Sequence, residues 1–265
     1  MFDRLFRRAA PEAQPQPSEA QPGPSRTYEV GWLFHNEKSS VIWDAPRPAR
    51  QDAPQTQAAK SVAFCPAVIE FDRRHFVIPC PVDIHLRLSV APDGKLNMTN
   101  VLGETSPVRQ ATLGQMLVVM PQNEWRHPQR PVIQMATPYL FVSDDPVYIN
   151  QFPPFLHYGQ APLPGVQLCG RFPIDVWPRH MMWALEWHDL SRDLVLKRGD
   201  PWFYVRFEGG DPSAQVRLFE AEKTPELESY LASITDVTNY VNRTFSLMKT
   251  ARERRPEKLV FPKKR

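Results

Sequence analysis

Between Val82 and Val90, apolar and polar residues alternate at every position. Successive side chains of a β-strand point to opposite faces, so this pattern predicts a strand with one apolar face and one polar face. The polar face carries Asp83, His85 and Arg87 in a row. This segment therefore predicts both a half-buried strand and the main candidate site of the chain.

The same kind of signal continues through most of the chain. Short apolar or alternating runs cover residues 62–71, 76–78, 115–120, 132–135, 139–142, 147–149, 166–169, 174–177, 181–187, 202–207 and 216–219. No helical periodicity separates them, and the 29 prolines favour short elements, because proline cannot donate to a central strand ladder. We therefore expect a mainly β fold, as a β-sandwich or a jelly roll.

Composition divides the chain into four parts. Residues 1–26 are rich in Pro, Gln and Ala and have few large apolar side chains, so we expect a disordered arm. Residues 27–220 form the mainly-β domain, with a Pro-rich loop at 45–59. A long amphipathic helix is expected over residues 224–255, followed by a basic tail at 256–265.

The C-terminal helix has a clear start signal and an apolar stripe. Thr224 is a good N-cap, and Pro225 suits the first helical position. The stripe consists of Leu227, Tyr230, Ile234, Val237, Val241, Phe245 and Met248. The predicted helix has about seven turns, which is longer than one face of a sheet of ordinary size can cover. The stripe therefore meets a protein partner or a second copy of the chain, or alternatively lies along its own sheet.

A metal site is one interpretation of the polar strand face. Jelly-roll oxygenases hold Fe(II) with two histidines and one carboxylate, two of them one residue apart on a strand. Asp83 and His85 have this spacing, and His180 is the candidate third ligand, with His188 as the other choice. The residue order is the reverse of the usual motif. The other interpretation of Asp83 and His85 is a salt-bridged surface.

Other features argue against several functional classes. The net charge of +3 is too small to indicate a polyanion partner, and basic residues are not interleaved with the aromatic ones, so nucleic acid is not expected. No stretch reaches the ~20 apolar residues of a transmembrane span. The chain lacks a secretory signal, and its three cysteines are not paired by spacing, which favours a cytoplasmic protein.

Two blocks of sequence resemble a known group of proteins. The first is residues 62–71 (VAFCPAVIEF), followed by 76–79 (FVIP) and Val82-Asp83. The second is residues 196–201 (LKRGDP), a strand that leads through a turn into an aromatic strand. Both are similar to segments of an uncharacterised family from marine tailed phages and some bacteria. That family has no assigned activity, so the resemblance implies a phage origin and no catalytic residues.

Two functions follow as expectations. The first is a non-enzymatic binding or interaction protein of unknown ligand that uses its C-terminal helix on a protein partner or for self-association. The second is a mononuclear non-heme Fe(II) oxygenase on a jelly-roll fold, with Fe(II) at Asp83, His85 and His180.

Overall fold

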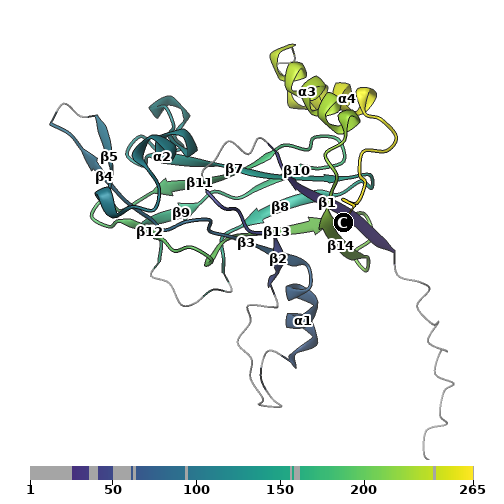
Figure 1. Ribbon diagram of the computed structural model, residues 1–265, viewed down its shortest axis with the longest axis horizontal. Helices are drawn as coiled ribbons and strands as arrows, with labels where there is room; N and C mark the ends of the chain where they lie inside the picture. Colours follow the sequence, from purple (N-terminus) through teal and green to yellow (C-terminus); the bar gives the residue numbers. More distant parts are fainter. Residues whose placement is uncertain are drawn as a thin grey trace, which may run out of the picture.

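The computed structural model of the protein describes residues 26–35, 41–49, 61, 64–92, 95–155, 157, 162–240 and 243–264. The arm predicted at 1–26 lies outside these ranges, apart from Arg26, whose guanidinium pairs with Asp145 at 2.9 Å. Strands dominate the described part, which confirms a mainly β fold (Figure 1).

The largest sheet, sheet A, has the strand order β14-β1-β7-β11-β9, and β6 also pairs with β7. Its strands are β1 (Thr27–Phe34), β6 (Leu117–Val119), β7 (Val132–Ser143), β9 (Gly165–Gln167), β11 (His180–Trp187) and β14 (Gln215–Glu220). The pair β1/β14 is parallel, and the other pairs of the sheet are antiparallel.

Two further sheets complete the β structure. Sheet B has the order β10-β8-β13-β3-β2, and sheet C has the order β12-β4-β5. The strands of sheet B are β2 (Arg47–Pro48), β3 (His75–Pro79), β8 (Tyr148–Phe152), β10 (Gly170–Pro173) and β13 (Pro201–Glu208). Those of sheet C are β4 (Ile84–Val90), β5 (Leu96–Asn100) and β12 (Leu194–Leu196). Figure 1 shows β4 and β5 projecting from one end of the body.

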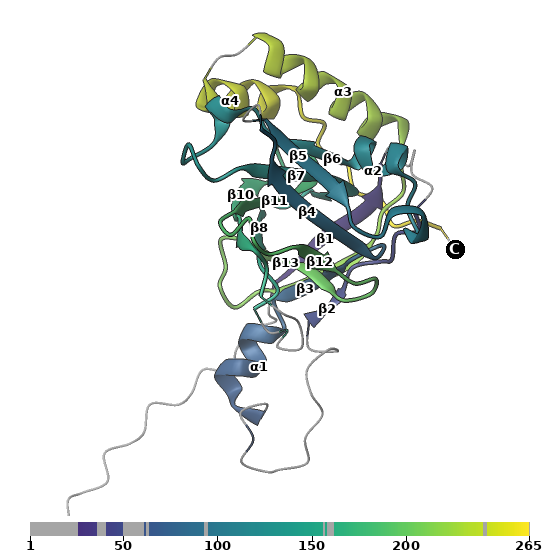
Figure 2. The same cartoon turned by 90° about the vertical axis from the view of Figure 1, so that its left-hand side faces the viewer.

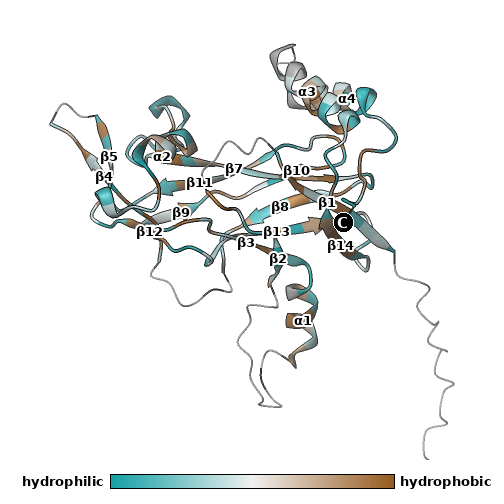
Figure 3. Ribbon diagram, viewed as in Figure 1, coloured by the Kyte–Doolittle hydropathy of each residue, from teal (hydrophilic) through white to brown (hydrophobic). Residues whose placement is uncertain are grey.

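Sheets A and B share the main hydrophobic core. Phe141 of β7 contacts Phe207 of β13 with ring centroids 5.4 Å apart, and Trp183 of β11 contacts Trp202 at 5.7 Å. Trp187 and Phe203 are buried in the same core. In Figure 3, many of the hydrophobic stretches follow the strands of these two sheets.

Strand β7 is buried on both faces. Tyr139 and Phe141 belong to the core between the sheets, while Leu140 and Val142 belong to a second cluster under the C-terminal helices. A strand covered on both sides has a continuous run of apolar residues in its sequence, as the segment from Tyr139 to Val142 has. Sheet A is therefore a middle layer, with sheet B on one face and helices on the other (Figure 2).

The α-helices are α1 (Pro66–Asp72), α2 (Gln110–Met116), α3 (Pro225–Tyr240) and α4 (Thr244–Arg254). Short 3-10 helices cover Gly103–Thr105 and Gln122–Glu124. Helices α2, α3 and α4 lie over the same side of the body, and α1 projects from the opposite side (Figures 1 and 2).

Several local predictions need correction. The strand expected at 174–177 is wrong, because β10 ends at Pro173 and the chain then turns, with the backbone N–H of Trp177 bonded to the carbonyl of Pro173 at 2.9 Å. The strand expected at 115–120 begins at Leu117, after α2.

The strand expected at 62–71 is wrong, because Pro66 stands in the first turn of a helix and its ring pre-sets the helical φ. The strand expected at 82–90 begins at Ile84. The loop expected at 45–59 contains the short edge strand Arg47–Pro48, which pairs with β3. An edge strand accepts proline, because one side of it needs no ladder partner.

The single C-terminal helix at 224–255 is also wrong: the structure has two helices, α3 and α4. The start signal is confirmed, since Thr224 Oγ1 accepts a hydrogen bond from the backbone N–H of Leu227 at 3.2 Å. A straight helix over 225–254 would be about 45 Å long, at 1.5 Å per residue, more than one sheet face supports. The break lets α4 fold back, so that the Tyr230 hydroxyl, which donates to the carbonyl of Val176 at 2.7 Å, also lies 3.1 Å from the carbonyl of Ala251.

The chain itself covers the described part of the stripe. Leu227, Tyr230 and Ile234 are buried against Leu140 and Val142 of sheet A and neighbouring residues. Met248 packs partly against the same cluster, whereas Phe245 is 90% exposed. The side chain of Val237 and the whole of Val241 lie outside the described residues. The covered residues support the alternative in which the stripe lies on its own sheet.

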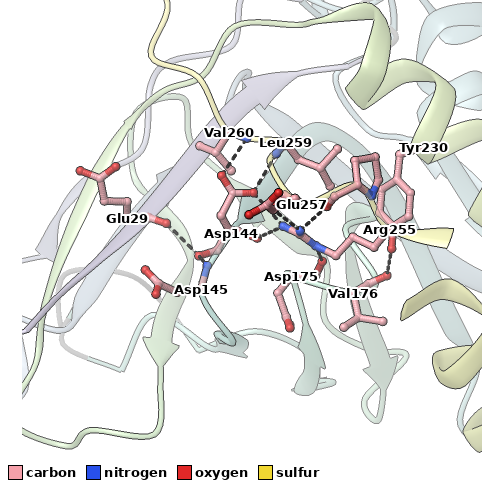
Figure 4. A network of polar contacts seen from close by, with 12 residues as sticks. Glu29, Asp144, Asp145, Asp175, Val176, Tyr230, Arg255, Glu257, Leu259 and Val260 are labelled. Carbon is pink, nitrogen blue, oxygen red and sulfur yellow. Dashed lines mark hydrogen bonds and ion pairs between the residues drawn. The ribbon is translucent and has the colours of Figure 1, made fainter. Parts of the chain in front are cut away.

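The segment predicted as a basic tail at 256–265 is docked on the body in its described part, while Lys258, Lys263 and Lys264 stay exposed. Leu259 and Val260 are buried, and Lys263 donates its backbone N–H to Glu220 of β14 at 3.0 Å. Arg255, with a side chain 12% exposed, lies 2.7 Å from Asp144. Figure 4 shows Asp144 joining Arg255 to the backbone of this segment.

Candidate functional site

The structure does not bring the predicted metal ligands together. Asp83, just before β4, accepts a hydrogen bond from the backbone N–H of Arg198 at 2.8 Å. His85 lies on β4 in sheet C, with its Nε2 2.8 Å from Asp193. His180 begins β11 in sheet A. In the described part of the chain, no three His, Cys, Asp or Glu residues gather in a metal-binding group.

His85 belongs to an ion-pair network on the polar face of β4. Asp193 accepts hydrogen bonds from Arg87 at 2.9 and 2.8 Å and is 2.8 Å from His85. The hydrogen bonds from Arg87, and then the one from His85, lower the pKa of Asp193 to about 2. This arrangement is the salt-bridged surface that was the other interpretation of the Asp83–His85 pattern.

The Asp193 network predicts a pH-dependent contribution to stability. A carboxyl pKa lowered from 3.8 to about 2 stabilises the folded state above about pH 4, and that contribution is lost as the pH falls toward 2. We expect Asp193→Asn to lower the free energy of unfolding by about 1 kcal/mol at neutral pH, because the partner Arg87 is exposed. Urea denaturation of both proteins across this pH range measures the difference. A difference that does not shrink on acidification contradicts the prediction.

His188, the other choice for the third ligand, is also in an ion-pair network. Its Nε2 lies 2.8 Å from the carboxylate of Glu186, which also accepts a hydrogen bond from Arg126 at 2.9 Å. Glu186 has a side chain only 3% exposed, so these partners offset the cost of burying its charge. The hydrogen bond between Arg126 and Glu186 connects the segment before β7 to β11. We assign this network a structural role.

His180 instead pairs with a histidine that the sequence analysis did not select. His35 Nδ1 and His180 Nε2 are 2.8 Å apart, and the ring centroids are 4.8 Å apart. His35 directly follows β1, and its backbone N–H bonds the carbonyl of Pro138 on β7. His180 pairs in register with Leu140 on the other edge of β7. The two rings thus meet across the middle strand of sheet A.

Two cavities adjoin this pair of imidazoles. The first has a volume of about 350 Å³ and is lined by Trp43, residues of α2 and Ala136 of β7. The second, of about 410 Å³, is lined by Trp177 and by residues of α3. Both have mainly apolar walls, and both are bordered by His35 and His180. The histidine pair is therefore the shared polar feature of two apolar cavities between sheet A and its helices.

Both histidines are held in the neutral form at neutral pH. Burial is the main cause that lowers the pKa of each ring. Lys223 lowers the pKa of His35 further, whereas Glu228 raises it. His35 and Arg179 lower the pKa of His180 further, whereas the nearby backbone of Thr137 raises it. Between two neutral rings, one nitrogen donates the hydrogen bond and the other accepts it.

No sequence signal links these two residues, which are 145 positions apart. Each stands at the end of a strand, outside any spaced motif. Only the pairing of β1 and β11 with the same strand brings them together. A prediction of strand pairing that placed His35 beside Pro138 and His180 beside Leu140 would have found the site.

Comparisons with known proteins add no assignment: no family model, no curated protein and no solved structure matches this chain. The resemblance to a phage family thus stays a prediction. Among the described helices, none is long and apolar enough to cross a membrane. The functional argument therefore depends on the geometry of the His35–His180 pair and its two cavities.

Proposed function

We propose that this protein is a non-enzymatic binding protein that takes a small, mainly apolar ligand beside His35 and His180. The observation that carries the proposal is the hydrogen-bonded imidazole pair at the border of two apolar cavities. Ligand sites are typically apolar concavities with a few convergent polar groups and perturbed pKa values. This region combines all three features in the described part of the chain.

The strand order supports a jelly-roll architecture for this binding protein. Along the chain, the strands switch between sheets A and B in the sequence β1, β3, β7, β8, β10, β11, β13 and β14. Sheet B then has the order β10-β8-β13-β3, as expected where two Greek keys are wound into two facing sheets. The parallel pair β1/β14 departs from a purely antiparallel roll. We propose a jelly-roll variant, with sheet C as an insertion.

The cavity walls indicate the chemistry of the ligand. A ligand with a flat or branched apolar body matches walls that include Trp43, Met116 and Met182. One hydrogen-bonding group on that body can interact with the neutral imidazoles. A strongly charged ligand is disfavoured inside the first cavity, because its walls offer no ionised side chain among the described residues.

A fluorescent apolar probe tests the proposal. We expect N-phenyl-1-naphthylamine, an apolar molecule with one N–H group, to bind saturably with increased fluorescence. Ala136→Leu places three extra carbons in the first cavity, so it should weaken binding by about tenfold, or about 1.4 kcal/mol. Fluorescence titration of the full chain measures both affinities.

The matched control is Ala111→Leu, the same substitution at an exposed position of α2 that does not line the cavity. This variant should bind the probe like the unmodified protein. Absence of saturable binding, or equal weakening in both variants, contradicts the proposed site. No contact in the described residues favours the Fe(II) oxygenase, and the described stripe residues of α3 are covered by the chain itself, so neither this enzyme nor a partner of the helix is proposed.

A further inference from the structure

We infer that His35 and His180 form a binding site for one divalent transition-metal ion, such as Zn²⁺, which replaces the proton that the two rings share. This inference goes beyond the proposed function, because it requires the two imidazoles and no apolar ligand. Two observations carry it: the spacing of the facing nitrogens and the space around them.

The spacing of the two nitrogens suits a bridging ion. His35 Nδ1 and His180 Nε2 face each other at 2.8 Å. Imidazole nitrogens lie about 2.0–2.1 Å from Zn²⁺, so two of them at a tetrahedral angle are about 3.3 Å apart. The two nitrogens need to separate by about half an ångström, and the rings need to rotate so that both lone pairs converge on the ion.

One of the two rings must change its tautomer to bind an ion. In the neutral pair, one facing nitrogen donates the hydrogen bond and the other accepts it. The donor ring moves its proton to its other ring nitrogen, which leaves its charge unchanged and both facing lone pairs free.

The two cavities leave room to complete the coordination shell. In the described part of the chain, no third His, Cys, Asp or Glu joins the pair in a metal-binding group. Water or a ligand atom in the cavities then fills the remaining positions, as in an open catalytic-type site. Imidazole ligands suit Zn²⁺, Ni²⁺ and Cu²⁺, and do not suit Mg²⁺. With two protein ligands, we expect micromolar affinity.

Isothermal titration of the full chain with ZnCl₂ near neutral pH tests the inference. We expect one Zn²⁺ per chain, no response to MgCl₂ and a melting temperature raised by Zn²⁺. His35→Ala and His180→Ala should each abolish the binding. His35→Asn retains a side chain that can hydrogen-bond to His180 and supplies a poor ligand, so it should keep the fold and lose Zn²⁺ binding. His127→Ala removes an exposed histidine and should change nothing.

The outcomes separate this inference from the proposed function. Ala136→Leu should keep Zn²⁺ binding while it loses affinity for N-phenyl-1-naphthylamine. A folded protein that binds the probe and not Zn²⁺ overturns the metal site alone. A protein that binds Zn²⁺ and not the probe overturns the proposed function alone. Unchanged Zn²⁺ binding by folded His35→Asn places the ion elsewhere and overturns the inference.

Discussion

Replacing Asp144 by alanine is expected to lower the free energy of unfolding by about 3 kcal/mol. Its carboxylate accepts hydrogen bonds from Arg255 at 2.7 Å and from the backbone N–H groups of Leu259 and Val260 at 2.8 and 3.2 Å. Without it, a mostly buried guanidinium loses its counter-charge, and two buried N–H groups lose their acceptor (Figure 4). Urea denaturation followed by tryptophan fluorescence measures the loss.

The neighbouring carboxylate is the matched control. Asp145 pairs with Arg26, whose side chain is 54% exposed, so Asp145→Ala should cost less than about 1 kcal/mol. Equal losses in the two variants would show that Asp144 does not hold the C-terminal segment. A further check is limited proteolysis, which should release the last residues from Asp144→Ala before it cleaves the rest of the chain.

Leu227→Asp is expected to unfold the protein or lower the free energy of unfolding by about 4 kcal/mol or more. Leu227 is fully buried between α3 and sheet A, and an aspartate there places a charge in an apolar cluster. The favourable position of an acid near a helix N-terminus offsets about 1 kcal/mol at most. Thermal and urea denaturation measure the effect.

Phe245→Asp is the contrasting change on the same predicted stripe. This side chain is 90% exposed on α4, so the substitution should alter stability by no more than about 0.5 kcal/mol. Comparison of the two variants distinguishes a stripe that is buried in the core from a stripe that forms an interface with another chain. If Leu227→Asp stays folded and changes the oligomeric state instead, the stripe is an interface between chains, and the interaction hypothesis regains its basis.

The sequence correctly predicted those elements whose structure depends on a single local rule. Alternation from Val82 to Leu88 corresponds to a strand with buried Ile84, Leu86 and Leu88, because side chains on a strand alternate whatever lies beyond it. Thr224 caps a helix that begins at Pro225, because the capping hydrogen bond joins residues only three positions apart.

Prediction failed where two local rules compete. The segment from Pro66 to Phe71 is apolar enough for a strand and begins with a residue suited to a helix start, and helix is the observed structure. The stripe after Thr224 is long enough for one helix, yet its two parts fold back on each other. The length of helix that can pack on a sheet depends on the size of that sheet. The periodicity of the sequence contains no information on this size.

By itself, the sequence determined the mainly β class, the alternating strand β4 and the start of the C-terminal helix, because each depends on residues within a few positions of one another. Only the tertiary structure decided the candidate site. His35 and His180 are 145 positions apart and meet because β1 and β11 pair with opposite edges of β7. Asp83 and His85, two residues apart, are held by different partners, Arg198 and Asp193. Strand pairing sets which side chains become neighbours, and it is a long-range property that no local spacing encodes.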